Sequence, residues 1–341
     1  MHSGEKVGIL LINTGTTDAP RAPETRTYLR EFLSDPRILD INPVARWLLL
    51  NLIILPRRPK QSAHAYSAVW TEKGSPLMVV TRDLLAGLEA RMPECAFAVG
   101  MRYGNPSIKS GLDELVKKNV DRIIAAPLYP QYSSAANGSA LELVYKLAGQ
   151  YWNVPPISAL PPFHADSGFL DAWAAVCKPV LDQFQPDLLL MSYHGLPERQ
   201  IKKSDTSGEY CLKQADCCEG VVDANRNCYR AHCFQTSRAL AERLGLTPER
   251  YSVSFQSRLG RDPWIKPATD IVIPTLPKKG VKRLAVVCPA FTADCLETVE
   301  EIAIRARSDF LMAGGEAFQH IPCLNTHPAW IEALSALLSR Y

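Results

Sequence analysis

His194, Glu297 and Glu301 have the residue types and the spacing for metal and proton chemistry. His194 directly follows the apolar run Leu188–Tyr193. A neutral imidazole at this position could accept a proton or bind a metal ion near neutral pH. The two glutamates are four residues apart in a predicted helix and share one face, and paired carboxylates can guide a divalent cation and pass protons. The ordinary alternative for His194 is a loop histidine that is hydrogen-bonded to the backbone. The ordinary alternative for the glutamates is that the helix dipole favours acidic residues in the first turns of a helix, which is the role expected of Glu300.

Cysteine is concentrated in one polar segment. Half of the ten cysteines lie within residues 211–233, namely Cys211, Cys217, Cys218, Cys228 and Cys233. Lysine, aspartate, asparagine and arginine alternate with them, so packing in the core does not explain their presence. Cytosolic thiols stay reduced, and four thiolates can bind zinc or an iron–sulfur cluster. The paired CxxC spacing usual for structural zinc is absent, and the residues leave both metals open.

Polar residues also follow two predicted strands of the first half, as Arg102 and Tyr103 and as Tyr132 and Ser133. Such side chains at strand ends can line an apolar pocket and bind the carboxylates of a ligand. Gly15 follows the first predicted strand, but its neighbours match neither dinucleotide-binding nor P-loop spacing. We therefore expect a tight turn there and no bound nucleotide.

The stretch 45–58 is apolar and lies among basic residues. It is too short to span a bilayer. One interpretation is a buried helix, which is the commoner case. The flanking charges favour an exposed lip instead, with Trp47 and Leu48–Leu55 making peripheral contact with acidic lipid headgroups or an oily ligand. The basic residues are Arg46, Arg57, Arg58 and Lys60.

Eight short apolar runs must position these residues. They are nearly continuous in apolar character and are separated by helical patterns, as expected of parallel strands that helices cover. We expect an α/β fold of two similar Rossmann-like halves, 1–165 and 166–341, each a parallel four-stranded sheet flanked by helices, the second carrying a cysteine-rich insert at 205–234. Functional residues then lie past the carboxyl ends of the strands. The runs are Val7–Asn13, Ala96–Met101, Arg122–Leu128, Pro156–Leu160, Leu188–Tyr193, Tyr251–Phe255, Arg283–Pro289 and Ala317–Ile321.

Length and charge exclude several classes of protein. The chain has 341 residues and a net charge of +3, too small to argue for binding to nucleic acid. Hydrophobic residues make up 47% of the chain, which excludes a disordered protein. No apolar run reaches the roughly 18 residues of a membrane span, and the N-terminal residues lack the layout of a signal peptide. We expect a monomeric, cytoplasmic protein.

A set of motifs, in order along nearly the whole chain, resembles those of the ferrochelatase family. The resemblance implies insertion of Fe²⁺ into protoporphyrin IX to give protoheme, the last step of heme synthesis, in a porphyrin cleft between two Rossmann-like halves. It gives the catalytic roles and the contact with the substrate iron to His194 and Glu297, with Glu301 continuing the acidic face. The motifs are Gly8–Thr16, Tyr28–Arg37, Gly74–Leu77, Met101–Tyr103, Tyr129–Ser133, Ser192–Pro197, Phe255–Gly260, Pro263–Trp264 and Asp294–Thr298.

The resemblance also implies a set of cleft residues and a cofactor. The cysteine-rich insert resembles that of a bacterial branch which holds a [2Fe-2S] cluster within the chain. Adjacent side chains are expected to point in different directions, so one of Cys217 and Cys218 should be a ligand, and we choose Cys218. The other expected ligands are Cys211, Cys228 and Cys233, and the implied cleft residues are Arg102, Tyr103, Tyr132, Ser133, Gln256, Ser257 and Trp264.

The chain departs from the family pattern at two points, and two other functions stay open. Cys295 stands where some members have a histidine, so no metal role passes to it. The animal-type C-terminal extension, which carries most cluster ligands, is missing. The alternatives are a chelatase for coproporphyrin or sirohydrochlorin, and a cluster-based metal-binding or sensor protein. None of these readings requires a nucleotide.

Overall fold

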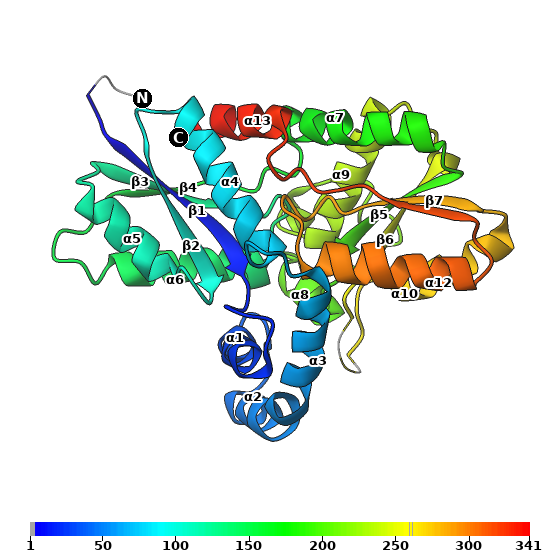
Figure 1. The fold of residues 1–341 in the computed structure, drawn as a ribbon, viewed down its shortest axis with the longest axis horizontal. Coiled ribbons are helices and arrows are strands. Elements are labelled where there is room, and N and C mark those ends of the chain that lie inside the picture. Colours follow the sequence, from blue (N-terminus) through cyan, green and yellow to red (C-terminus); the bar gives the residue numbers. More distant parts are fainter. Residues whose placement is uncertain (1–3, 259, 261) are drawn as a thin grey trace. The chain divides into compact units, whose positions relative to one another are not determined.

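The computed structural model describes residues 4–258, 260 and 262–341, which divide into two compact units (Figure 1). The first unit comprises the chain up to Leu128 with residues 134–161 and 334–341, and the second comprises residues 129–133 and 162–333. These units differ from the expected halves in three short segments. Residues 129–133 and 162–165 belong with the second unit, and residues 334–341 belong with the first.

A four-stranded parallel sheet forms the centre of the first unit, in the order β2-β1-β3-β4. Its central strand is continuously apolar, and residues Ile9–Ile12 are fully buried. Burying each such aliphatic side chain stabilises the fold by roughly 1.5–3 kcal/mol. The strands are β1 (Val7–Gly15), β2 (Ala96–Tyr103), β3 (Arg122–Pro127) and β4 (Ile157–Ala159).

Helices cover this sheet, and small residues allow their close approach. Gly111 of α5 lies against the sheet, where an added Cβ would come within 2.7 Å of the carbonyl oxygen of Val99. Gly15 ends β1 with a φ of +101°, so the expected tight turn is present. The helices are α1 (Ala22–Ser34), α2 (Pro43–Leu48), a π-helix (Leu49–Ile54), α3 (Leu55–Val69), α4 (Pro76–Arg91), α5 (Ile108–Lys117), a π-helix (Ser134–Gly138) and α6 (Ser139–Ala148).

The second unit repeats the same strand order, β6-β5-β7-β8, again with all strands parallel. Leu190 and Met191 of the central strand β5 are fully buried, as are Val286 and Val287 of its neighbour β7. The expected α/β class with two four-stranded parallel sheets is confirmed. The strands are β5 (Leu188–His194), β6 (Tyr251–Gln256), β7 (Arg283–Val287) and β8 (Ala317–His320).

Most helices of the second unit are short, and two are long. Of the helices in the second unit, α7, α9 and α12 contact its sheet. The α-helices are α7 (Ser167–Phe184), α8 (Glu198–Lys203), α9 (Tyr229–Arg243), α10 (Thr269–Val272), α11 (Leu296–Thr298) and α12 (Arg307–Met312), and α13 (Pro328–Leu338) ends in the first unit. A π-helix spans Val299–Ala306, and 3₁₀ turns span Asp223–Asn225, Pro248–Arg250, Ile273–Thr275 and Pro277–Lys279.

Candidate functional site

His194 is the last residue of β5, at the carboxyl end of the central strand of the second sheet. Its Nδ1 lies 2.6 Å from the carbonyl oxygen of Gly195. Because a carbonyl oxygen only accepts hydrogen bonds, Nδ1 carries the proton in the neutral imidazole. No described residue hydrogen-bonds to Nε2, which keeps its lone pair. The ring is thus held by one nitrogen and can bind a metal ion or a proton with the other.

Gln256 connects His194 to the acidic helix. It ends β6 and pairs in register with His194. Its buried amide nitrogen donates to the backbone carbonyl of Glu297 at 2.8 Å and lies 3.3 Å from the carboxylate of Glu301. Its amide oxygen accepts a hydrogen bond from Ser192 at 2.8 Å. Gln256, which the resemblance places in the cleft, therefore ties the strand end to the start of the helix.

Glu301 is largely buried, and Ser257 donates a hydrogen bond to its carboxylate. Burial raises the pKa of Glu301, and the negative charge of Glu297 raises it further, whereas Ser257, His194 and Arg305 lower it. Ser257 reaches the carboxylate from a left-handed backbone conformation with a φ of +66°. Such a conformation is uncommon for a residue with a side chain. The raised pKa favours the protonated form of this carboxyl group, which suits a group that exchanges protons.

Glu297 and Glu301 lie on a helix that changes its winding between them. Glu297 is in α11, and Glu301 is in the following π-helix. The charge of Glu297 raises the pKa of Glu301, so the two carboxylates are near enough to interact. Glu300 is bound instead by Arg305, five residues further along, and Arg305 also lies 3.8 Å from Glu301. π-helical segments occur often at functional sites.

The loop that carries Trp264 is fastened to the loop after His194. Trp264 pairs with Pro197 in an isolated bridge, and the backbone N–H of Ile265 donates to Leu196 at 3.0 Å. An added Cβ at Gly195 would come within 2.8 Å of the carbonyl oxygen of Gln256 and 3.1 Å of the indole ring. A glycine is therefore required after His194. Of the motif Phe255–Gly260, residue 259 lies outside the described residues.

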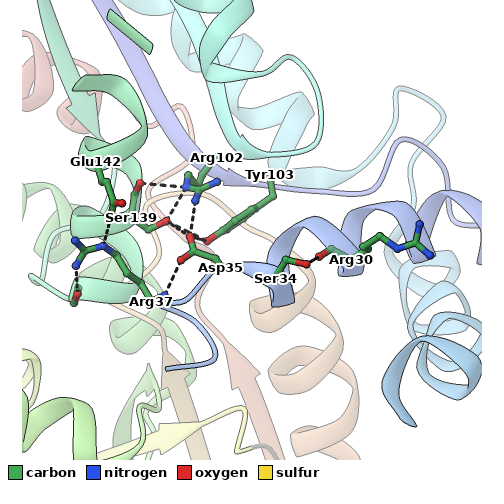
Figure 2. A network of polar contacts seen from close by, with 9 residues as sticks. Arg30, Ser34, Asp35, Arg37, Arg102, Tyr103, Ser139 and Glu142 are labelled. Carbon is green, nitrogen blue, oxygen red and sulfur yellow. Dashed lines mark hydrogen bonds and ion pairs between the residues drawn. The ribbon is translucent and has the colours of Figure 1, made fainter. Parts of the chain in front are cut away.

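Arg102 and Tyr103, the predicted cleft residues of the first unit, are held in an internal network around Asp35 (Figure 2). The buried carboxylate of Asp35 accepts hydrogen bonds from Arg102 at 2.5 Å, from the Tyr103 hydroxyl at 2.8 Å, and from Ser139. The backbone N–H of Arg37 donates to it at 2.7 Å. Burial alone would raise the pKa of Asp35, but these donors and the Arg102 charge outweigh it and lower that pKa.

Tyr103 is fully buried, and burial raises the pKa of its hydroxyl. Its guanidinium neighbour Arg102 also bonds Ser139 and lies over the Tyr103 ring at 4.4 Å. Both residues thus have partners inside the first unit. The network that engages them depends on Asp35 and Ser139, which the sequence analysis did not single out.

Tyr132 and Ser133 belong to the segment 129–133, which is part of the second unit. Tyr132 is half-buried and Ser133 is buried. The backbone N–H of Tyr132 donates to Nδ1 of His232 at 3.2 Å, and the side chain of the preceding Gln131 donates to Thr236 at 3.1 Å. This segment is therefore attached to α9, which begins directly after Cys228.

The five clustered cysteines are all buried in the second unit. The polarity of the segment predicted that these are not core cysteines, but their side chains are nevertheless buried. The Sγ atoms of Cys217 and Cys218 are 3.9 Å apart, so these neighbours do not point in different directions. The Cys228 thiol affects the pKa of the Cys211 and Cys218 thiols, and Cys218 affects the pKa of Cys233, so these side chains lie near one another.

Polar groups surround these thiols. The backbone N–H of Leu212 donates to Cys217 Sγ at 3.4 Å, and the guanidinium of Arg230 donates to Cys218 Sγ at 3.0 Å. Burial raises the pKa of the Cys211 thiol to about 11. Within the described residues, no three His, Cys, Asp or Glu side chains are arranged to hold a single metal ion.

The lip 45–58 combines exposed and buried apolar residues. It lies in a continuous helical stretch formed by α2, a π-helix and the start of α3. Trp47, Leu52 and Ile53 are 60%, 63% and 53% exposed, whereas Leu50 and Leu55 are buried against α1 residues such as Leu33. Beside Trp47 lies a groove of about 570 Å³ with Arg30 and Arg46 in its wall. Among the described residues, no helix is both long and apolar enough to cross a membrane.

Comparison with known proteins identifies the family of the chain. A family model described as ferrochelatase matches residues 6–341. The ferrochelatase of Coxiella burnetii (strain RSA 493 / Nine Mile phase I) is 43% identical over 341 residues, covering 100% of this chain and 95% of that protein. The ferrochelatase of Azotobacter vinelandii is 45% identical over 330 residues, covering 96% and 97% of the two chains.

Solved structures show the same fold at much lower sequence identity. SirB from Bacillus subtilis has a TM-score of 0.55 at 13% identity, covering 98% of this chain and 95% of that chain. At that identity the likeness concerns the fold alone. The match of the family model and the identity to full-length relatives go further: the chain belongs to the ferrochelatase family.

Proposed function

We propose that this protein inserts Fe²⁺ into protoporphyrin IX to give protoheme, with His194 and Glu297 carrying the reaction. The observation that carries the proposal is the arrangement at the carboxyl end of β5. There His194 presents Nε2, and Gln256 links its strand to the carbonyl of Glu297 at 2.8 Å. A base and two carboxylates on one scaffold suit a reaction in which a cation enters and two protons leave.

The chemistry of the substrate defines what these residues must do. The free-base porphyrin has two pyrrolic N–H groups, and both protons leave as the iron enters without change of oxidation state. His194 accepts one proton at Nε2 or holds the incoming iron. Glu297, with Glu301 behind it, takes the second proton or helps remove water from the metal ion. A rigid site that binds a saddled ring better than a flat one exposes the nitrogen lone pairs.

A comparison of substrates tests this function. Purified protein with Fe²⁺ and protoporphyrin IX should form heme, and with Zn²⁺ it should form the zinc porphyrin, both measured by absorbance. Coproporphyrin III and sirohydrochlorin serve as competing substrates under the same conditions. Strong insertion into either of these with none into protoporphyrin would reject the choice of substrate and leave a chelatase of different specificity.

We further propose that the cysteine segment binds a [2Fe-2S] cluster through Cys211, Cys228, Cys233 and one of Cys217 and Cys218. The residues fit this group, since buried thiols in contact with one another are available and the N–H of Leu212 and the guanidinium of Arg230 can stabilise thiolates. A two-iron cluster takes its four thiolates as two pairs, so three ligands around one point are not required. Metal insertion needs no electron transfer, so we expect a structural role for such a cluster. Binding the cluster would order the segment.

Iron and acid-labile sulfide analysis tests the cluster. The expected result is a red-brown protein, bleached by dithionite, with equal amounts of iron and sulfide. Cys228→Ser should remove the colour, whereas Cys95→Ser, at a half-buried cysteine outside the segment, should leave it unchanged. One zinc with no sulfide would show that the segment binds a different metal. The separate variants Cys217→Ser and Cys218→Ser identify which of these two cysteines is not a ligand.

We also propose that the exposed part of the lip makes peripheral contact with an anionic membrane surface, where an apolar porphyrin is dissolved. The support is the exposure of Trp47, Leu52 and Ile53 beside the groove that contains Arg30 and Arg46. Replacing Leu52 and Ile53 by serine should weaken sedimentation with phosphatidylglycerol vesicles and raise KM for porphyrin. Ile304→Ser, at an exposed residue of the second unit, is the matched control. Unchanged sedimentation of the Leu52/Ile53 variant would reject the membrane contact.

A further inference from the structure

One imidazole joins the cysteine segment to a predicted substrate-binding loop. His232 is buried in the first turn of α9, next to Cys233. Its Nε2 lies 2.8 Å from the carbonyl oxygen of Arg226, which can only accept, so Nε2 carries the proton. Its Nδ1 then accepts the backbone N–H of Tyr132 at 3.2 Å. The two nitrogens thus bond two segments that are about 100 residues apart in the chain.

The surroundings of His232 fix the ring in place. His164 stacks on it with the ring centroids 3.7 Å apart and the planes within 9°. His164 is bonded in turn to Gln235 at 2.8 Å, one turn further along α9. The stacked rings leave His232 little freedom to turn away from its partners.

A second contact runs parallel to the first. The side chain of Gln131 donates to the hydroxyl of Thr236, four residues after His232, at 3.1 Å. That hydroxyl is in turn bonded to the carbonyl oxygens of His164 and His232, each at 3.0 Å. The residues that precede Ser133 are therefore fixed to α9 through main chain and side chain alike, while the first turn of α9 is part of the cysteine segment.

We propose that His232 is a positioning residue that sets the place of Tyr132 and Ser133 according to the order of the cysteine segment. The inference rests on the proposed function and on the implication of the family resemblance that these two residues line the porphyrin site. The segment then acts on substrate affinity through the hydrogen bonds Arg226–His232–Tyr132, without an electron-transfer role. A disordered segment frees the imidazole, and the Tyr132 loop loses its anchor.

Two half-replacements separate the two bonds. In His232→Gln the side-chain amide can still donate to Arg226, but nothing accepts from Tyr132. In His232→Asn the amide oxygen takes the place of Nδ1 and accepts from Tyr132, while the donor to Arg226 is lost. We expect His232→Gln to raise KM for porphyrin roughly fivefold, the effect of one neutral hydrogen bond, with kcat nearly unchanged. His232→Asn should keep KM and speed the reaction of the segment's cysteines with a thiol reagent.

Hydrogen exchange provides a readout that does not require turnover. The amide of Tyr132 should exchange faster in His232→Gln than in the wild type or in His232→Asn. Equal exchange and equal KM in all three proteins would overturn the proposal. So would an equal rise of KM in both variants, because ring packing rather than the nitrogen would then matter. If the wild-type protein inserts no metal, only the proposed function is refuted. The hydrogen-exchange result would then still decide the role of His232.

A second variant covers the case in which substitutions at His232 prevent folding. Thr236→Val removes the hydroxyl that accepts from Gln131 and leaves the imidazole in place. It should raise KM for porphyrin and speed exchange at residues 131–133, by less than His232→Gln. Wild-type values for both quantities in a folded Thr236→Val protein would count against the anchored loop.

Discussion

The two units have the same sheet order but use the carboxyl ends of their strands differently. In the first unit, Arg102 and Tyr103 at the end of β2 are hydrogen-bonded to Asp35 and Ser139. In the second unit, His194 at the end of β5 is held by one nitrogen, and its other nitrogen has no hydrogen-bond partner among the described residues. The first cluster is closed and the second is open.

This difference shows which features of a strand end indicate chemistry. In the closed cluster, four donors satisfy one buried carboxylate and lower its pKa, which stabilises a charge within the unit. In the open cluster, burial and a neighbouring carboxylate raise the pKa of Glu301, which favours the protonated form of the group. Residue types alone do not separate these cases, because arginine, serine and acidic residues occur in both clusters.

Removing His194 should have the largest effect on activity. His194→Ala deletes the open nitrogen, and we expect turnover to fall by roughly 10²–10⁴-fold, the range for loss of a general acid–base group. The fold should persist, because the side chain makes one short contact to its own loop. Insertion of Zn²⁺ and circular dichroism measure the two quantities. Wild-type activity would reject both the proton and the metal role of His194.

Glu297→Gln should come next, with turnover roughly 10²-fold lower, since the change removes the charge and keeps the shape. The control is Glu300→Gln on the same helix, because Glu300 is bound by Arg305 and lies outside the pairing of Glu297 with Glu301. The control should keep most of the activity. Equal losses in both variants would mean that helix stability, rather than the Glu297 carboxylate, governs the reaction.

Asp35→Asn should affect stability more than turnover. It leaves the Arg102 guanidinium without its buried partner, and breaking such a pair costs about 3–5 kcal/mol. Thermal unfolding measures the loss, and kcat of the remaining folded protein should change little. Glu142→Gln is the control, because Glu142 is an exposed partner of Arg37 and should contribute less than about 1 kcal/mol. Intact stability with lost activity would break the contrast between the closed and open clusters.

The same carboxylate predicts a dependence of stability on pH. The pKa of Asp35 is lower in the folded protein than its ordinary value of 3.8, so the unfolded chain binds more protons as the pH falls. The stabilisation is therefore complete above about pH 4 to 5 and is lost as the pH falls through the folded pKa. Asp35→Asn should flatten this acid limb of a plot of melting temperature against pH. An unchanged slope would place the acid sensitivity elsewhere.

Much of the fold could be predicted from the sequence because it depends on local patterns. The eight apolar runs correspond to the eight strands, since a strand buried on both faces must be apolar throughout. The turn at Gly15, the strand-end position of His194 and the helix that bears Glu297 and Glu301 follow from neighbouring residues alone. The ordered motifs supplied the family, because they extend over nearly the whole chain.

The tertiary structure decided which polar groups are satisfied and which stay open. Asp35 and Ser139 are 104 residues apart in the chain, yet both lie at the Tyr103 hydroxyl. The residues near Tyr103 in the sequence do not predict these contacts. His232 likewise meets Tyr132 from a distance of 100 residues. The Sγ atoms of Cys217 and Cys218 lie close together because these residues form a turn, although extended neighbours would point apart. Hydrogen bonds and burial depend on such long-range contacts, whereas strand and helix patterns depend on near neighbours, so the sequence determined the scaffold and the tertiary structure decided how its polar groups are used.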